Sequence, residues 1–421
     1  MPAGCRRSRE ISEVATFLSN WLSRSVKAVC SPVTRIVTAL SVTQLIGWGT
    51  TFWLPAVTGP AMARELDIPL SMAMAGPTVM LIVMAFMSWP LSIILERYGA
   101  RPAMAIGSVF GSTGLLAIDL AQGPFSYFLS WTILGLAGSG MLTTPAQIAV
   151  TEAVDKTTAR KALGVLILAG GLTSSIMWPL TGLLQAGWGW RTTSLVYAAL
   201  MVVICAPLHW LALPNARSKN STTKSTNAPA HIDRRSFALL AITFAANGFF
   251  TWGFALTIII LFEAGGLDHA SAVMAATFIG IAQWAGRLVD FLGGQRWSGF
   301  VPGLTAAALF PLSFMVLLVT SSFDGAIVFA ILYGLASGIT AVTRATLPLE
   351  IFPSGTYARA SAQLSVPLNL AFAAAPPVFA AVMTSAGPHA ALWLAFAISV
   401  VAFCTLLSLS ARFHGRGRVS R

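Results

Sequence analysis

The sequence contains few charged residues for a chain of 421 residues. Asp, Glu, Lys and Arg together make up 10% of it, whereas soluble domains carry about 25%. Hydrophobic residues make up 56%, and they form roughly twelve blocks, each matching the ~20 residues of a helix that crosses a bilayer. This composition excludes a soluble globular protein and predicts a polytopic membrane protein.

The apolar blocks predict the fold class, an all-α membrane protein of about twelve transmembrane helices in two six-helix bundles. Lipid offers the backbone no hydrogen-bond partner, so each block must cross as a helix whose peptide groups pair internally. The expected spans are residues 36–58, 71–93, 102–121, 126–150, 162–184, 192–213, 237–262, 271–289, 301–320, 325–348, 361–384 and 390–411.

Acidic residues are missing from the middle of every expected span. Glu96 and Asp290 stand in short loops, and Asp119, Glu152 and Glu350 stand near span ends. A proton-coupled symporter usually carries a buried carboxylate, because burial moves its pKa towards neutral. The absence favours exchange, facilitated diffusion or movement of a proton together with the substrate, with Asp119 and Glu152 as alternative proton sites.

Cysteines and histidines are also few, and none forms a catalytic or metal-binding pattern. Cys5, Cys30, Cys205 and Cys404 lack the spacing of a metal site or of a CxxC pair, so we expect no metal and no cofactor. The sequence has no GxxxxGK(S/T) phosphate loop, which argues against ATP-driven transport. No nucleophile with a base stands at membrane depth, so we do not expect an enzyme.

Positive charge is plentiful by comparison, with 26 Lys and Arg against 14 Asp and Glu. All of these basic residues except Arg64, Arg191 and Arg344 lie in the two tails, in alternate loops or at the adjoining helix ends. Such loops remain on the cytoplasmic side, so we expect both termini in the cytoplasm and the protein in the cytoplasmic (inner) membrane. The basic residues do not gather on one face with aromatics between them, which argues against nucleic acid as a partner.

The chain divides into five expected parts. In order they are a cytoplasmic N-terminal segment, a first bundle, a flexible cytoplasmic linker, a second bundle and a basic cytoplasmic tail, at residues 1–35, 36–213, 214–236, 237–411 and 412–421. In the N-terminal segment, Ile11, Val14 and Leu18 recur at helical spacing, which predicts an interfacial helix. The alternative is a dispensable extension.

The two bundles carry traces of an internal repeat. Trp48-Gly49 in the first span is matched by Trp252-Gly253 in the seventh. The loops after the second and eighth spans each combine a small residue, an acid four positions later and then a glycine. The residues of these two loops are Ser92, Glu96, Arg97, Gly99 and Arg101, and Gly286, Arg287, Asp290 and Gly293.

The loop from Ser92 to Arg101 resembles the Gly-x-x-x-Asp-Arg/Lys-x-Gly-x-Arg/Lys pattern of the major facilitator superfamily of secondary transporters, and the resemblance covers residues 36–411. Ser92 replaces the leading Gly of the pattern, and Glu96 replaces its Asp. The resemblance implies that both loops act in gating. Glu96, Arg97 and Arg101 would lock the two bundles together on the cytoplasmic side in the outward-open state.

The resemblance also implies a mechanism and a branch of the family. The two bundles would rock about a central site and expose it to one side of the membrane at a time. Gly47-Trp48-Gly49 and Trp178-Pro179-Leu180 look like bacterial members near the monocarboxylate and oxalate–formate exchangers. We expect a monomer whose partners are a small-molecule substrate, the lipid bilayer and either a coupling proton or a counter-substrate.

Arg344 is the basic residue placed inside an expected span. Ionisable residues inside a membrane are costly, and a guanidinium pairs bidentately with carboxylates. Arg344 therefore predicts a fixed positive charge that holds an anionic substrate. In the alternative interpretation, Arg344 extends to the membrane surface or pairs with Glu350, about 9 Å away along the same helix.

Uncharged polar and aromatic residues near the middle of the spans complete the candidate binding site. They are Gln44, Trp48, Thr144, Gln147, Asn247, Trp252, Gln283, Tyr333 and Asn369. For each of them the alternative is a hydrogen bond across a helix contact, worth about 0.6 kcal/mol in lipid. Together with Arg344 they predict transport of a small organic anion, and the alternative function is efflux of drug-like or toxic compounds.

Overall fold

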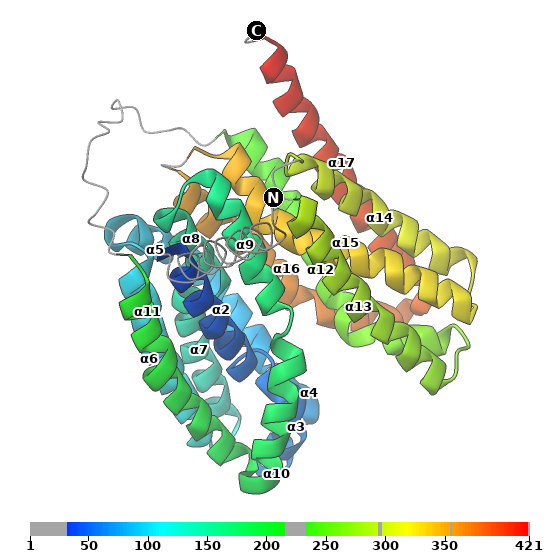
Figure 1. Cartoon of the computed structure of the whole chain (residues 1–421). Coiled ribbons are helices and arrows are strands. Elements are labelled where there is room, and N and C mark those ends of the chain that lie inside the picture. The colour runs from blue at the N-terminus through cyan, green and yellow to red at the C-terminus, as the bar shows by residue number, and fades with distance from the viewer. Residues whose placement is uncertain (1–31, 215–232, 294–296, 354–355, 420–421) are drawn as a thin grey trace, which may run out of the picture.

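The computed structural model describes residues 32–214, 233–293, 297–353 and 356–419, and nearly all of them are helical. Two groups of helices stand side by side, one coloured blue to green and the other green to red (Figure 1). The all-α fold with two helical bundles is therefore confirmed. The expected interfacial helix and most of the expected linker lie outside the described residues.

The first bundle is built from short helices that follow one another closely. Its elements are α2 (Pro32–Thr50), α3 (Leu54–Glu65), α4 (Leu70–Met74), α5 (Gly76–Tyr98), α6 (Ala100–Asp119), α7 (Pro124–Met141), α8 (Thr143–Ala153), α9 (Lys156–Gly170), α10 (Thr173–Leu200), the π-helix η1 (Met201–Cys205) and α11 (Ala206–Ala212). Helices α3, α5 and α7 carry proline in one of their first two positions, where its missing N–H costs no helical hydrogen bond.

The second bundle is built from long helices. Its elements are α12 (Arg234–Ala264), α13 (His269–Gly293), α14 (Phe300–Val319), α15 (Phe323–Ile351), α16 (Tyr357–Ala386) and α17 (Pro388–Val419). Helix α15 has 29 residues and α16 has 30, so each exceeds the ~20 residues that a bilayer requires. The expected basic tail begins inside α17, because that helix continues to Val419.

Ten helical stretches in the described part of the chain are long and apolar enough to cross a membrane. One of them, Thr157–Ala212, turns back at Gly189 and so contains two crossings (Figure 1). Gly189 has φ 78°, a left-handed conformation that glycine adopts without strain. A further crossing is formed by α2, with 19 residues, together with α3, with 12 residues, and neither is among the ten stretches. Counting Thr157–Ala212 as two crossings and adding the one formed by α2 and α3 brings the ten stretches to the expected number of about twelve.

The two ends of the bundles can be named from the loops they carry. The first is the linker end, where α5 passes into α6 at Gly99 and where Arg101 stacks on Trp210 of α11, near the start of the linker. The opposite end, which holds the turns at Gly189 and Gly387, is the far end. In each bundle, separate apolar clusters fill the linker end and the far end.

In the described part of the chain, the main contacts between the bundles are made by four helix pairs. Helix α16 packs along α5 and also contacts α8, and α9 contacts both α13 and α15. Within the first of these contacts, the hydroxyls of Ser88 and Ser365 are 3.1 Å apart. The interface between the bundles is therefore where α2, α5, α8 and α9 face α13, α15 and α16, and it encloses the candidate site.

Candidate functional site

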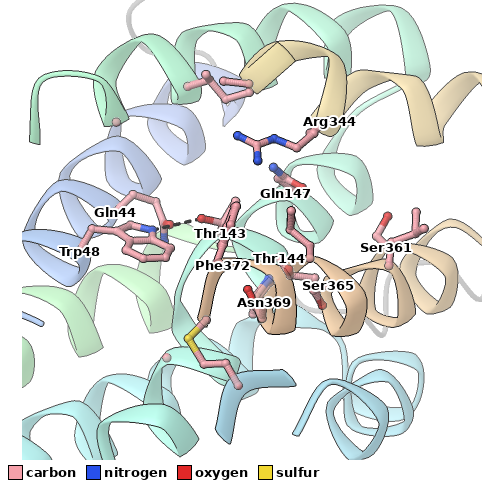
Figure 2. Close-up of a pocket in the computed structure, with 18 of the residues that line it drawn as sticks. Gln44, Trp48, Thr143, Thr144, Gln147, Arg344, Ser361, Ser365, Asn369 and Phe372 are labelled. Carbon is pink, nitrogen blue, oxygen red and sulfur yellow. Dashed lines mark hydrogen bonds between the residues drawn. The ribbon is translucent and has the colours of Figure 1, made fainter. Parts of the chain in front are cut away.

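A cavity of about 300 Å³ lies between the two bundles. Residues from α2, α8, α15 and α16 project into it together (Figure 2). Seven of the predicted binding residues line it, namely Gln44, Trp48, Thr144, Gln147, Trp252, Arg344 and Asn369. Seven of the ten predicted binding residues thus meet at one cavity, although their contacts could not be predicted.

Two arginines of the second bundle line the cavity, Arg287 on α13 and Arg344 on α15. Nε of Arg287 and Nη1 of Arg344 are buried and have no hydrogen-bond partner among the described residues. The guanidinium carbon of Arg344 lies 5.6 Å from the centroid of the Phe372 ring. No Asp or Glu occurs among the described lining residues, so the lining carries two positive charges and no negative one.

The alternative interpretation of Arg344 is not what the structure shows. Glu350 does not pair with Arg344, because its Oε1 lies 2.8 Å from Nη1 of Arg160 and accepts a 2.6 Å bond from the backbone N–H of Gly299. Arg344 lines the cavity and points into it (Figure 2).

Arg287 reaches from the second bundle to the break between α9 and α10 in the first. A Cβ built on Gly171 would overlap Nη1 of Arg287, so the glycine leaves the space that the guanidinium fills. Helix α9 ends at Gly170 and α10 begins at Thr173, so Gly171 lies in the short break between them. The break therefore supplies room for the guanidinium of Arg287.

The opposite wall of the cavity contains a second break, at Leu142 between α7 and α8. Gln44 donates to the carbonyl of Met141 at 2.9 Å, and the indole N–H of Trp48 donates to Thr143 at 3.1 Å (Figure 2). These two α2 side chains thus hold the start of α8 in place. The first-turn N–H groups of a helix form its positive end, which favours an anion.

A row of polar side chains on α16 borders the cavity. Ser361, Ser365 and Asn369 recur every four residues and so share one helix face (Figure 2). Ser365 bonds with Ser88 of α5, whereas the Ser361 hydroxyl is buried without a hydrogen-bond partner among the described residues. The row offers neutral donors and acceptors beside the two arginines.

Three of the predicted binding residues lie outside the cavity lining as the structure describes it. Asn247 is buried within α12, and Gln283 donates to Ser337 at 2.8 Å inside the second bundle. Tyr333 packs in an aromatic cluster and donates to the carbonyl of Thr251 at 3.2 Å. Gln283 and Tyr333 thus contact their own bundle. The sequence gives the depth of a residue but not its direction, and one residue along a helix turns the side chain by about 100°.

The ion pairs that join the bundles at the linker end, among the described residues, centre on Arg160, near the start of α9. Its Nη1 is 2.8 Å from Glu350 at the end of α15, and its Nη2 is 4.0 Å from Asp290 on α13. We refer to Arg160, Asp290 and Glu350 as the clasp. Asp290 was among the predicted gating residues, whereas Arg160 and Glu350 were not.

The predicted lock by the loop after α5 does not occur in this structure. Glu96 and Arg97 are exposed, and Arg97 lies over the ring of Tyr98 in its own bundle. Arg101 likewise stacks on Trp210 of the first bundle, at 4.6 Å from the ring centroid. Ser92 is buried and bonds to the Trp89 carbonyl. The described ion pairs across the bundles at this end come from the clasp instead.

The remaining predicted gating residues have structural surroundings that explain their residue types. Gly99 has φ 78° at the tight turn between α5 and α6, where a side chain would be strained. A Cβ on Gly286 would lie 2.5 Å from the Leu335 carbonyl, so this glycine allows α13 to pack closely on α15. Gly293 ends α13.

Sequence comparison supplies the family context. Residues 39–286 match the family model described as Major Facilitator Superfamily. The Fujikurins efflux protein of Gibberella fujikuroi is 25% identical over 62% of this chain and 57% of its own length. Monocarboxylate transporter 4 of Rattus norvegicus is 25% identical over 62% of this chain and 58% of its own length. The match to these two relatives thus spans less than two thirds of their length.

Comparison with solved structures supports the fold. The crystal structure of the human organic anion transporter MFSD10 (TETRAN) superposes with a TM-score of 0.69 at 16% identity, covering 89% of this chain and 100% of that chain. The crystal structure of FucP, a Major Facilitator Superfamily transporter in the outward conformation, superposes with a TM-score of 0.69 at 14% identity. The superposition covers 90% of this chain and 99% of that chain. At these identities the likeness concerns the fold alone.

Proposed function

Because this chain belongs to the Major Facilitator Superfamily, we propose that it carries a small organic anion across the membrane by alternating access. The observation that carries this proposal is the pair Arg287 and Arg344, whose charges face the cavity with no acid among the described lining residues. A buried guanidinium is stabilised by a carboxylate that bonds to it in a bidentate manner. Relatives named monocarboxylate transporters support an anionic substrate.

The surrounding groups fit the same proposal. The positive end of α8 faces the cavity through Thr143 and Thr144, and it adds to the field of the two arginines. Gln147 and Asn369 provide amides that can bond to the rest of the substrate. A lipophilic cation would be repelled by this lining, since like charges at close range cost several kcal/mol.

The clasp defines one end of the transport cycle in this proposal. Arg160, Asp290 and Glu350 hold the linker end together, so release of substrate at that end requires their separation. The distribution of Lys and Arg supports a linker end that faces the cytoplasm, in a protein that we propose to lie in the inner membrane. Because the described lining contains no acid, we propose that a counter-substrate drives the return step. The proposed carrier is a monomer.

The proposal is tested with the purified protein and a panel of acetate, lactate, phosphate, glucose and tetraphenylphosphonium. A ligand at about 100 times its Kd stabilises a protein by about 2.7 kcal/mol, which is measurable as a rise in melting temperature. We expect carboxylates to raise the melting temperature. In Arg344→Gln, the apparent affinity for these carboxylates should be at least about tenfold lower. The control is Arg359→Gln, which removes an exposed arginine near the start of α16.

Efflux of a larger compound is the second candidate, because the Fujikurins efflux protein is among the relatives. It predicts stabilisation by the lipophilic cation or by neutral solutes and indifference to Arg344→Gln. That result would overturn the anion proposal.

A further inference from the structure

Aromatic rings from both bundles form a continuous series that starts at Arg344. The guanidinium of Arg344 stacks on Phe372, whose ring centroid lies 4.6 Å from that of Trp252. Trp252 lies 4.5 Å from Phe52, and Phe52 lies 5.8 Å from Trp48. We refer to Trp48, Phe52, Trp252 and Phe372 as the aromatic wall. It joins helices α2, α12 and α16 next to a positive charge.

Three rings of the aromatic wall are exposed to the cavity, namely those of Trp48, Trp252 and Phe372. Their positions are fixed by the surrounding structure. A Cβ on Gly248 would lie 2.7 Å from Cε1 of Phe372, so the glycine allows that ring to pack against α12. Trp48 is held by its bond to Thr143. Rings held in this way can bind a flat ligand without first being ordered.

We propose that the transported anion is an aryl-substituted monocarboxylate, whose carboxylate binds Arg344 and whose ring packs on the aromatic wall. This inference rests on the proposed function, because it adds recognition of a ring to the anion site. A cavity of about 300 Å³ is at the small end of ligand sites and suits one ring. Paired aromatic rings prefer centroid separations of about 4.5–7 Å in tilted or edge-on arrangements, and the wall already shows this geometry.

A single carboxylate is sufficient for this site despite its two arginines. Arg287 packs against Gly171 and fills the space that this glycine leaves between α9 and α10. Arg344 has no comparable partner among the described residues beyond the face of Phe372. The substrate carboxylate therefore binds Arg344 first and is attracted more weakly by Arg287.

The test compares matched ligands on the full chain by thermal shift titration. Phenylacetate has the ring and the charge, cyclohexylacetate has the same charge without an aromatic face, phenylacetamide has the ring without the charge, and malonate has two charges without a ring. We expect phenylacetate to bind about three- to tenfold more tightly than cyclohexylacetate and at least about tenfold more tightly than phenylacetamide.

Variants of Trp252 distinguish the contribution of the aromatic wall to binding from that of the arginine charge. In Trp252→Leu the ratio of the phenylacetate and cyclohexylacetate affinities should fall to near one, whereas Trp252→Phe should keep most of it. Trp393→Leu is the matched control, because Trp393 is 56% exposed on the outside of α17 and should leave the ratio unchanged.

Each other outcome has a definite meaning. Equal binding of phenylacetate and cyclohexylacetate by the unaltered protein overturns the aryl inference and leaves the anion proposal standing. Tighter binding of malonate than of phenylacetate also overturns it, in favour of a dianion held by both arginines. Binding of phenylacetamide as tight as that of phenylacetate would overturn the anion proposal and the inference together.

Discussion

The two bundles line one cavity with helices of different construction. In the first bundle, crossings are divided between α2 and α3, between α7 and α8 and between α9 and α10, and the last two breaks, at Leu142 and Gly171, lie beside the cavity. In the second bundle, α13, α15 and α16 each pass the cavity as a single helix. The first bundle therefore presents helix ends together with uncharged side chains, and the second presents the two arginines.

This difference separates two sources of electrostatic attraction. A helix end carries about half an elementary charge, positive at its N-terminus and negative at its C-terminus, and cannot change its protonation. An arginine carries a full charge but must be held in place to act. Here the arginines come from the second bundle, and the break at Gly171 in the first bundle receives one of them. Movement of one bundle against the other would therefore change the surroundings of Arg287.

The largest effect on the transport rate is expected at the clasp, where oppositely charged side chains of the two bundles form ion pairs. Arg160→Glu places like charges beside Glu350 and Asp290 and should slow transport by about tenfold or more in proteoliposomes. The double variant Arg160→Glu with Glu350→Arg restores the opposite pairing and should recover most of the rate. Lys161→Glu is the control, because Lys161 is the exposed neighbour on α9.

A failure of the double variant to recover would remove the pairing from the mechanism. An equal loss in Lys161→Glu would point to the charge at the start of α9 instead of the clasp.

A smaller effect is expected where a break of the first bundle receives a side chain of the second. Gly171→Ala adds a methyl group that overlaps Arg287, and overpacking of this kind should weaken anion binding by about three- to tenfold. Gly182→Ala is the control, since a Cβ there meets nothing within 4 Å and Gly182 is not among the described lining residues. Titration of both variants with the same carboxylate measures the difference. Equal losses would show that glycine flexibility, and not the fit to Arg287, is what matters.

The sequence predicted the features that depend on composition along one helix. Apolar blocks of bilayer length predicted the crossings, since lipid leaves the backbone no alternative to a helix. Arg344 was found because an arginine inside an apolar block is costly and needs a reason. Gln44 and Trp48 were found as polar groups in the same setting, although their hydrogen bonds to α7 and α8 were not foreseen.

The features that depend on two helices meeting could not be predicted in this way. Asn247, Gln283 and Tyr333 were placed in the cavity by their depth, but depth does not give the rotation of a helix about its axis. Arg160 and Glu350 are 190 residues apart, and neither stands out in the sequence. The break at Gly171 had a signal in the pair Gly170-Gly171, but its fit to Arg287 depends on how the bundles pack.

The smallest effect is expected at Glu96, and it sharpens the comparison between the equivalent loops of the two bundles. Asp290 is 3% exposed and faces Arg160 across the interface, whereas Glu96 is exposed on its own bundle. An exposed charge contributes little, so Glu96→Gln should change the transport rate by less than about twofold. Asp290→Asn should change it several times more, because it removes a buried member of the clasp. If Glu96→Gln slows transport more than Asp290→Asn in the same assay, the loop after α5 locks the bundles together in another conformation. The difference in burial between Glu96 and Asp290 would then be a property of the present conformation only.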